Sequence, residues 1–541
     1  MLSTMQDVPL SIAQILRHGS TVHRGATVTT WTDSGPQHRT YAEVGQRCGA
    51  LAHALRGLGV TGDQRVATFM WNNAEHLECY LAVPAMGAVL HTLNIRLFPE
   101  QLIHVVNHAE DHVIIVDPSL IPLLQPHLHK LGTVRHVVVT GSSTTGLDVP
   151  EGVQVHAYET LIAEQSAEFG WPDVEERSAA AMCYTSGTTG DPKGVVYSHR
   201  SIYLHSMQVC MSDGPNLRQG DRALAVVPQF HAMAWGLPYA AFMIGASLIM
   251  PDRFLQPKPL ARIIESEQPT LAAAVPTIWQ GLHLHLEQNP QDISFIREVL
   301  VGGSAVPPSL MHSFEDDHQV TVLHAWGMTE TSPLGSVARP PAGVAGDEMW
   351  RYRYSQGRFP ASVQARLIGD DGATIPHDGR GVGELEVRGP WIAGAYYGVA
   401  TPEKFNDGWL RTGDVGSITS DGYLTLTDRT KDIIKSGGEW ISSVDLENAV
   451  MGHPAVAEAA VIGVPDEKWD ERPLVAVVLR HDSTSVTVDE LKEFLTDKVA
   501  GWQLPENWAL IDEVPKTSVG KFDKKRLRAS YRDGELDVVR A

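Results

Sequence analysis

The segment that most constrains the fold reads Tyr184-Thr-Ser-Gly-Thr-Thr-Gly-Asp-Pro-Lys-Gly194. It lies between two short apolar runs, residues 179–184 and 195–197, which predicts a strand–loop–strand element. Its glycines let the backbone turn N–H groups toward an anion, while its hydroxyls and its lysine add donors and a positive charge. The residues concerned are Thr185, Ser186, Gly187, Thr188, Thr189, Gly190 and Lys193. The segment therefore predicts a loop that can hold a polyphosphate.

Composition alone leaves a flexible Gly/Thr surface loop as the alternative for this segment. The fixed order of eleven residues is more specific than composition and favours the phosphate-binding interpretation. The segment is not a Walker A loop, because the pattern G-x-x-x-x-G-K-[ST] does not occur in the chain. The nearest approach ends at Lys521, where Pro515 stands in place of the first glycine.

Helix and strand patterns alternate along the rest of the chain. Thr40 and Glu43 have capping-box spacing, and apolar residues follow them at helical intervals. Apolar runs at residues 65–70, 113–116 and 136–140 indicate buried strands. This alternation predicts an α/β fold with several layers.

The pattern starts afresh near Asp428. Ser442 and Thr487 each cap a predicted helix, and strand-like runs lie between them at residues 456–462 and 474–479. We therefore expect two domains, a large N-terminal one and a small α+β one. Their predicted bounds are residues 1–430 and 431–541.

Charge and composition exclude several classes of protein. The 541 residues include 64 acidic and 43 basic ones, a formal net charge of −21, which argues against nucleic acid as the main partner. Four cysteines without a CxxC pair suggest a reducing compartment. The most apolar stretch, residues 223–250, contains prolines and polar residues and is expected to be core, so we predict no integral membrane segment. With no secretory signal visible, a cytoplasmic location is expected.

The eleven-residue segment resembles one in the adenylate-forming superfamily of acyl-CoA synthetases, luciferases and nonribosomal peptide adenylation domains. Further motifs of that superfamily occur in its order over nearly the whole chain. They are Pro228-Gln-Phe-His-Ala-Met-Ala-Trp235, Gly302-Gly-Ser-Ala305, Trp326-Gly-Met-Thr-Glu330, Thr412-Gly-Asp414, Asp428-Arg-Thr-Lys-Asp432, Lys435-Ser-Gly-Gly-Glu439 and Pro515-Lys-Thr-Ser-Val-Gly-Lys521. The resemblance implies the acyl-CoA synthetase/luciferase-like fold, with a large multi-layer N-terminal domain and a small mobile C-terminal domain.

The resemblance also implies a nucleotide site. Besides the phosphate loop, the residues expected to bind ATP or AMP are Gly302, Gly303, Ser304, Ala305, Trp326, Gly327, Met328, Thr329, Asp414 and Arg429. Glu330, with Thr185, is expected to hold Mg²⁺, a hard cation that favours oxygen ligands. A carboxylate such as Asp414 suits two ribose hydroxyls. The alternatives are an ordinary tight turn for residues 302–305 and a solvated loop acid for Glu330.

Other matched positions are implied to handle the acid and the acceptor. His231 borders the acid site and Trp235 resembles the gate of a fatty-acyl tunnel; the alternative for both is an ordinary core residue. Lys521 aligns with the adenylation lysine, assisted by Lys193, and Lys431 with the hinge between the domains. The residues expected at the coenzyme A (CoA) site are Lys435, Gly437, Gly438 and Glu439.

The implied reaction consumes ATP and a carboxylic acid to form an acyl-adenylate, then passes the acyl group to CoA. The catalytic residues expected are Lys521, Glu330, His231 and Lys193. The segments at residues 87–97, 435–454 and 502–505 look like those of bacterial medium- and long-chain fatty acyl-CoA synthetases. The alternatives are a ligase for a short, sulfur-containing or aromatic acid, a carrier-protein adenylation module, a luciferase-like enzyme, and a non-catalytic nucleotide-binding protein. A homodimer is a further expectation from the family.

Three histidines recur at intervals of four residues, His104, His108 and His112. This spacing predicts one helical face, on which the histidines are either metal ligands or surface residues. Without an obvious carboxylate partner or a precedent in the family, we expect surface residues. One departure from the family pattern, Ala361-Ser362 in place of Pro-Gly, is expected to alter a turn and not the chemistry.

Overall fold

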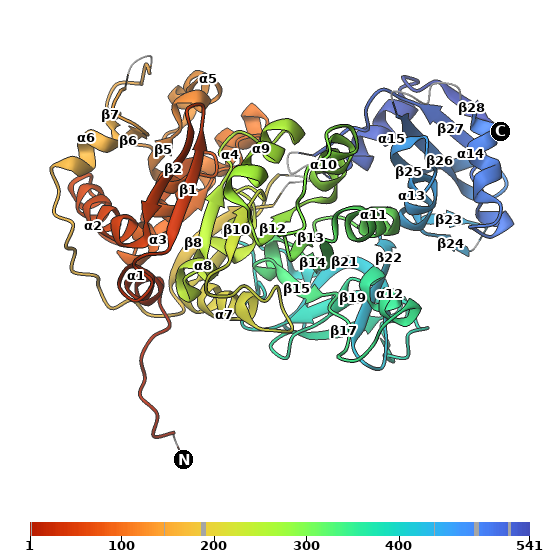
Figure 1. Cartoon of the computed structure of the whole chain (residues 1–541), viewed down its shortest axis with the longest axis horizontal. Helices are drawn as coiled ribbons and strands as arrows, with labels where there is room; N and C mark the ends of the chain where they lie inside the picture. Colours follow the sequence, from red (N-terminus) through yellow and green to blue (C-terminus); the bar gives the residue numbers. More distant parts are fainter. Residues whose placement is uncertain (2, 145–146, 186–190, 438, 481–485, 518–520) are drawn as a thin grey trace.

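A computed structural model of the chain describes residues 1, 3–144, 147–185, 191–437, 439–480, 486–517 and 521–541. Within these residues the strands form three sheets, and the predicted alternation of helices and strands is confirmed. Figure 1 shows the small C-terminal domain beside the larger body of the molecule, where it faces α10 and α11. This arrangement agrees with the predicted fold class, a large layered α/β N-terminal part followed by a small α+β C-terminal part.

The first sheet has the strand order β7-β6-β5-β3-β4-β8-β9, parallel except for the last pair. Its strands are β3 (Arg65–Phe69), β4 (Val89–Thr92), β5 (Asp111–Val116), β6 (His136–Val139), β7 (Gln154–Ala157), β8 (Ala179–Tyr184) and β9 (Gly194–Ser198). Short runs of Val, Ile and Ala form them, as expected of parallel strands covered on both faces.

The second sheet is larger and changes character along its length. A parallel part, β14-β13-β12-β10-β11-β1, continues into an antiparallel part that ends at β18. Its strands are β1 (Thr27–Thr32), β2 (Gly35–Thr40), β10 (Arg222–Ala225), β11 (Ser247–Met250), β12 (Leu271–Ala274), β13 (Glu298–Val301), β14 (Thr321–Gly327), β15 (Leu334–Val337), β16 (Gly357–Arg358), β17 (Gln364–Ile368), β18 (Thr374–Ile375), β19 (Gly383–Arg388), β20 (Phe405–Asn406), β21 (Trp409–Ile418) and β22 (Tyr423–Arg429).

Helices cover both sheets and fill the space between them. They are α1 (Ile12–Thr21), α2 (Tyr41–Gly57), α3 (Ala74–Ala85), α4 (Pro99–Ala109), α5 (Ile121–Leu124), α6 (Tyr158–Ala163), α7 (His199–Cys210), α8 (Leu237–Ile244), α9 (Pro257–Glu267), α10 (Pro276–Gln288), α11 (Pro308–His318) and α12 (Asp347–Tyr354). The central core joins α1, α2, α3, α7 and α8 to one face of each sheet. The opposite faces are covered by α4 and α5 on the first sheet and by α9, α10 and α11 on the second. The result is a layered α/β body.

The third sheet belongs to the C-terminal part of the chain. Its strands are β23 (Ile434–Ser436), β24 (Glu439–Ile441), β25 (Val456–Asp466), β26 (Asp470–Leu479), β27 (Asn507–Leu510) and β28 (Val538–Arg540). The helices beside it are α13 (Ser443–Met451), α14 (Val488–Leu495) and α15 (Lys524–Arg532). The domain boundary at residues 430 and 431 stays a prediction.

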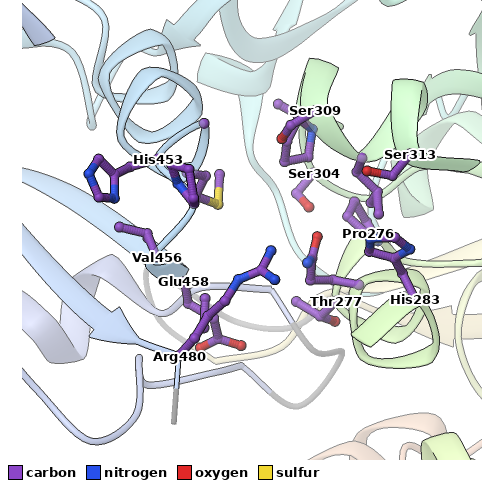
Figure 2. Close-up of a pocket in the computed structure, with 18 of the residues that line it drawn as sticks. Pro276, Thr277, His283, Ser304, Ser309, Ser313, His453, Val456, Glu458 and Arg480 are labelled. Carbon is purple, nitrogen blue, oxygen red and sulfur yellow. The ribbon is translucent and has the colours of Figure 1, made fainter. Parts of the chain in front are cut away.

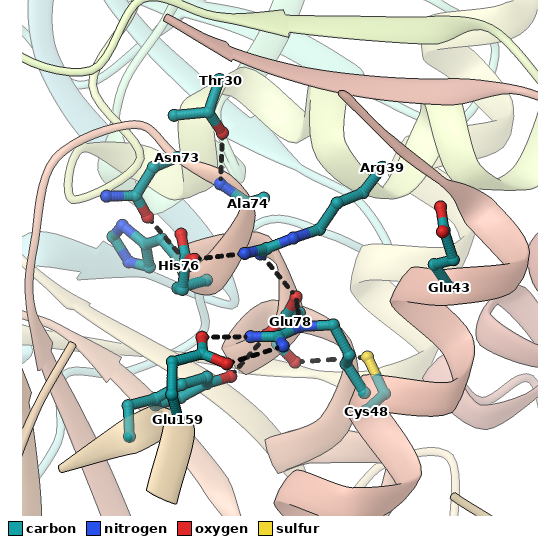
Figure 3. Close-up of polar contacts among 12 residues, drawn as sticks. Thr30, Arg39, Glu43, Cys48, Asn73, Ala74, His76, Glu78 and Glu159 are labelled. Carbon is teal, nitrogen blue, oxygen red and sulfur yellow. Dashed lines mark hydrogen bonds and ion pairs between the residues drawn. The ribbon is translucent and has the colours of Figure 1, made fainter. Parts of the chain in front are cut away.

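A buried ionic network ties the inner helices together (Figure 3). The Glu78 side chain on α3 is fully buried, and its Oε1 accepts from Arg39 Nη1 at 2.9 Å and Arg47 Nε at 2.6 Å. The Tyr158 hydroxyl donates to the other Glu78 oxygen at 2.6 Å, and Arg47 also pairs with Glu159 at 2.7 Å. These contacts join β2, α2, α3 and α6, elements far apart in the chain.

Two sequence expectations about helices were wrong. Helix α4 ends at Ala109, and Glu110 takes the left-handed backbone conformation with φ 56°, so His112 lies in β5 and not on the helical face of His104 and His108. The helical spacing after Thr487 also predicts Leu491, Leu495 and Val499 on one face, but helix α14 ends at Leu495 and Val499 lies beyond it. The apolar stretch of residues 223–250 forms β10, α8 and β11 in the core. Among the described residues, every helix is too short or too polar to cross a membrane.

Candidate active site

The phosphate-loop segment is flanked by two strands, as predicted. Tyr184 at the end of β8 pairs with Gly194 at the start of β9. Beyond this pair, Thr185 N donates to Lys193 O at 3.0 Å and Lys193 N donates to Thr185 Oγ1 at 3.1 Å. These bonds set the positions of the first and last residues of the loop. The remaining predicted residues, Ser186, Gly187, Thr188, Thr189 and Gly190, lie outside the described residues.

Glu330 lies next to the end of this loop and is buried, with 6% of its surface exposed. It is therefore not a solvated loop acid. Its Oε1 accepts from the Tyr396 hydroxyl at 2.5 Å, and its carbonyl accepts from Ala393 N at 2.8 Å. The Lys193 ammonium lies 5.1 Å from the centroid of the Tyr396 ring. Tyr396 thus contacts both the acidic and the basic member of the predicted phosphate site, although it lies outside every motif found in the sequence.

Asp414 on β21 has a partner on each oxygen. The Trp326 indole N–H donates to Oδ2 at 2.8 Å, and Arg429 Nε lies 3.2 Å from Oδ1. Asp414 and Trp326 are buried, with 5% and 7% of their surface exposed. The Trp326 ring covers Gly335, where a Cβ would lie 2.2 Å from the ring. The indole therefore holds the carboxylate that the sequence assigned to the ribose.

Hydrogen bonds to backbone atoms and close packing hold the residues that follow Trp326. The Tyr197 hydroxyl on β9 donates to Thr329 O at 2.7 Å, which ties the strand after the phosphate loop to the turn that carries Glu330. At Gly327 a Cβ would overlap Pro333 O. Met328 N donates to Thr331 Oγ1 at 2.9 Å. This turn is therefore closely packed and depends on its glycine.

The turn after β13 approaches two functional side chains. A Cβ on Gly302 would lie 2.9 Å from Ala325 O and 3.5 Å from the Trp235 ring. Gly303 has φ +90°, and a Cβ there would lie 3.4 Å from Lys521 Cε. Ser304 and Ala305 line the cleft between the two domains. Residues 302–305 are thus a tight turn in close contact with the predicted acid gate and the predicted catalytic lysine.

Lys521, from the small domain, reaches into the large domain. Burial and then the Arg429 charge lower the pKa of Lys521 to about 8, while Asp414 and Glu330 act in the opposite direction. A partly buried ammonium with these neighbours loses its proton at a lower pH than an ordinary lysine, in a range where a catalytic group is effective. The small domain is therefore placed so that its lysine joins the carboxylates of the large domain.

His231 and Trp235 bound a strained turn. Four consecutive residues other than glycine, Ala232 to Trp235, have φ between 42° and 56°. Such conformations are costly for residues with a Cβ and occur most often at functional sites. Burial, followed by the Lys521 and Arg96 charges, lowers the pKa of His231 to about 3, so its imidazole is neutral. Both residues were named as site residues from their motif, but the left-handed backbone conformation of residues 232–235 was not predicted.

The predicted CoA residues occupy a different region, whereas the predicted hinge residue Lys431 lies near Arg429, and its charge contributes to the lowered pKa of Lys521. Arg528 pairs with Asp432 at 2.8 Å and approaches the Lys431 carbonyl at 3.5 Å. Lys435 N donates to Glu471 at 2.9 Å, and Gly437 N donates to Trp469 O at 2.8 Å. Lys435, Gly437 and Glu439 are exposed on the β23–β24 hairpin, and Gly438 lies outside the described residues. In Figure 1 this hairpin lies at the opposite end of the small domain from α15.

A cleft of about 880 Å³, counting the part open to solvent, lies between the domains (Figure 2). One wall carries Thr277 and His283 of α10, and the other carries His453 and Arg480 of the small domain. Arg480 Nη1 reaches across to Glu287 of α10 at 3.4 Å. The two domains therefore meet through an ion pair as well as through Lys521.

Comparison with known proteins assigns the family. A family model described as "AMP-binding enzyme" matches residues 16–397, and one described as "AMP-binding enzyme C-terminal domain" matches residues 445–521. The chain belongs to the AMP-binding enzyme family.

The relatives of this AMP-binding enzyme match it from end to end. It is 43% identical to a medium-chain-fatty-acid–CoA ligase of Ectopseudomonas oleovorans, over 98% of each chain. It is also 43% identical to a long-chain-fatty-acid–CoA ligase of Thermus thermophilus, over 98% of this chain and 97% of that one. A 3-methylmercaptopropionyl-CoA ligase of Ruegeria pomeroyi is 41% identical, over 98% and 99%. The anthranilate CoA ligase AuaEII shares the fold, with a TM-score of 0.87 at 24% identity over 98% of this chain and all of that one.

The donor groups of this AMP-binding enzyme suit a cation that is bound mainly by phosphate. The described residues include no cluster of three or more His, Cys, Asp or Glu side chains able to hold a metal. Glu330 offers one buried carboxylate with acceptor capacity beyond its bond to Tyr396, and Thr185 offers a hydroxyl. Mg²⁺ in nucleotide sites typically takes one or two carboxylates and completes its shell with phosphate oxygens and water. The residues present fit that pattern.

Proposed function

We propose that this chain is an ATP-dependent fatty acid–CoA ligase. It activates a medium- or long-chain fatty acid as an acyl-adenylate and transfers the acyl group to CoA, with release of pyrophosphate and AMP. The observation that carries the proposal is the position of Lys521. This small-domain lysine lies beside Gly303 and among the charges of Asp414, Arg429 and Glu330.

In the first half-reaction the chain's own residues position the reactants and balance charge. Lys521 bridges the acid's carboxylate and the α-phosphate of ATP as negative charge develops. Lys193 binds the phosphates that leave, and Asp414 accepts hydrogen bonds from the ribose hydroxyls. Glu330 and Thr185 would hold Mg²⁺, which neutralises phosphate charge when bound. The neutral imidazole of His231 borders the carboxylate of the bound acid and does not compete with that carboxylate for a proton.

In the second half-reaction the CoA thiol attacks the acyl-adenylate carbonyl. The exposed hairpin residues Lys435, Gly437 and Glu439 are proposed to reach the active site by rotation of the small domain about Lys431, which withdraws Lys521. Gly437 has φ +60°, its N–H is bonded to Trp469 O, and a Cβ there would lie 2.6 Å from the Trp469 ring. The conformation of this hairpin therefore depends on glycine at position 437.

The acid is proposed to be a fatty acid because of Trp235 and of the relatives. Trp235 is buried beside Gly302, and its match to the fatty-acyl gate of the family supports an apolar acid. Two relatives that match 98% of this chain are named for medium- and long-chain fatty acids. A short, sulfur-containing acid is the second candidate, because a relative at 41% identity is named for 3-methylmercaptopropionate.

The test is acyl-CoA formation, measured by mass spectrometry, from ATP, Mg²⁺ and CoA with acids from acetate to palmitate and 3-methylmercaptopropionate. The proposal predicts highest kcat/KM for acids of medium or long chain. Preference for 3-methylmercaptopropionate would replace the substrate assignment while keeping the chemistry. ATP binding without turnover of any acid would contradict the enzymatic proposal. A homodimer and a cytoplasmic location stay expectations; light scattering tests the first.

A further inference from the structure

A hydrogen bond lies beside the strand that leads into the phosphate loop. The Tyr184 hydroxyl, in the last residue of β8, lies 2.6 Å from His108 Nδ1, in the last turn of α4. Burial raises the pKa of Tyr184, so the phenol keeps its proton and donates. Burial and the nearby His104 lower the pKa of His108, so its ring is neutral and Nδ1 can accept. The helix that covers the first sheet is thereby joined to the residue that precedes Thr185.

The segment Tyr396 to Gly398 closes around the same histidine. Tyr397 N donates to Gly194 O at 2.9 Å, and its ring lies 5.4 Å from the His108 ring. Gly398 has φ +65°, and a Cβ there would lie 3.0 Å from His108 Nε2. Tyr396, in the same segment, contacts Glu330 and Lys193. One short segment therefore connects His108, the end of the phosphate loop and the acidic residue opposite it.

The surroundings of Tyr184 show that this contact is more than apolar packing. His91 on β4 lies 5.1 Å from the Tyr184 ring, and its Nδ1 lies 2.9 Å from both carboxylate oxygens of the fully buried Asp111. The other charged group near Tyr184 is Arg65. Buried polar groups cost stability unless they are bonded, and bonded networks select one arrangement. Simple apolar side chains would fill this space at less cost.

We propose that His108 is a positioning residue for ATP. By accepting the Tyr184 hydroxyl, it fixes the ends of β8 and β9, so that Thr185 and Lys193 face Glu330 when the nucleotide binds. The inference rests on the proposed function, since it concerns the same nucleotide site. His108 touches neither the substrates nor the reacting atoms. Its loss is therefore expected to weaken ATP binding and to leave the acid and CoA steps unchanged.

The experiment compares three variants with the wild-type protein. His108→Leu and Tyr184→Phe each remove the bond, whereas His108→Asn keeps an acceptor near the position of Nδ1. Losing one buried hydrogen bond predicts a rise of about fivefold to tenfold in the KM for MgATP in pyrophosphate exchange. The His108→Asn variant should keep the KM for MgATP close to the wild-type value. The KM for the acid and the rate of CoA transfer from synthetic acyl-adenylate should both stay within about twofold of the wild-type values, because neither step depends on this bond.

The matched control is His112→Asn, a change four residues away at a ring that contacts Leu58 O and not Tyr184. It should leave the KM for MgATP unchanged. The proposal is overturned if His108→Leu and Tyr184→Phe keep the wild-type KM, or if the Asn variant loses as much as the Leu variant while all melt at the same temperature. A calorimetric Kd for a non-reactive ATP analogue repeats the comparison without turnover. A wild-type protein that binds the analogue but activates no acid would contradict the proposed function instead.

Discussion

The charge on Lys521 should set the upper pH limit of adenylate formation. Its folded pKa of about 8 lies below the usual 10.5, so the ammonium loses its proton as pH rises through about 8. Because kcat/KM reports the free enzyme, we predict that kcat/KM for ATP in pyrophosphate exchange falls above about pH 8. The pH profile of CoA transfer from synthetic acyl-adenylate should not show this fall. A profile for exchange that stays flat to about pH 10, the usual range of an unperturbed lysine, would contradict the assignment.

Tyr396 is the residue that links the acidic and basic sides of the phosphate site. Tyr396→Phe removes the donor to Glu330 and keeps the ring beside Lys193. A lost bond to a charged group predicts about a tenfold or larger fall in pyrophosphate exchange. The matched control is Tyr397→Phe, which keeps the backbone N–H bonded to Gly194 O and the ring beside His108. Equal activity of Tyr396→Phe and wild type would show that the bond has no role.

At the residue scale the sequence identified the motif residues and missed their supports. Glu330, Asp414 and Lys521 were named from the order of the motifs, and the structure brings the three together. Tyr396 and His108 were not assigned to the site, because each acts through a tertiary contact with a residue far along the chain. A Tyr or a His outside a motif carries no local signal of such a contact.

At the scale of elements, helix starts were predictable and some helix ends were not. The capping boxes at Thr40 and Thr487 and the cap at Ser442 are confirmed, because side chain and backbone satisfy each other locally. Helix α4 ends at a left-handed Glu110, without a glycine, which made His112 appear to continue the helix. Where no glycine or proline marks an end, tertiary packing decides it.

The Glu78 network should dominate the attachment of α3 to its neighbours. Glu78→Ala leaves Arg39 and Arg47 without their shared buried carboxylate, and breaking such a pair costs about 3–5 kcal/mol of stability. Thermal and urea unfolding should therefore show a large loss. Glu43→Ala, which removes an exposed capping partner, should cost only about 1 kcal/mol. Similar losses in both variants would mean that the network contributes little.

At the scale of the whole molecule, the ion pair between Glu287 and Arg480 joins the domains in the arrangement that inserts Lys521. Glu287→Lys places two cations at this contact and should slow pyrophosphate exchange by up to about fivefold, the range of an exposed pair. Exchanging the two charges, Glu287→Lys with Arg480→Glu, should restore it. CoA transfer from acyl-adenylate should not fall in either variant. No recovery in the double variant would show that the pair does not stabilise this arrangement.

The layered architecture was predictable from alternation of helix and strand, and the family resemblance supplied the order of the motifs. The relative placement of the domains was not predictable from pattern, since the contacts between them join α10 to residues nearly two hundred positions away. The β23–β24 hairpin illustrates the same limit, because its motif indicated a CoA site while its position depends on the orientation of the small domain.

The most direct test of the account separates the two half-reactions in the Lys521→Ala variant. If Lys521 stabilises charge at the α-phosphate, the variant should lose pyrophosphate exchange with decanoate by about 10²-fold or more, as for other groups that stabilise developing charge. It should still consume synthetic decanoyl-adenylate with CoA at close to the wild-type rate. Retained exchange, or an equal loss in both half-reactions at unchanged stability, would contradict the account.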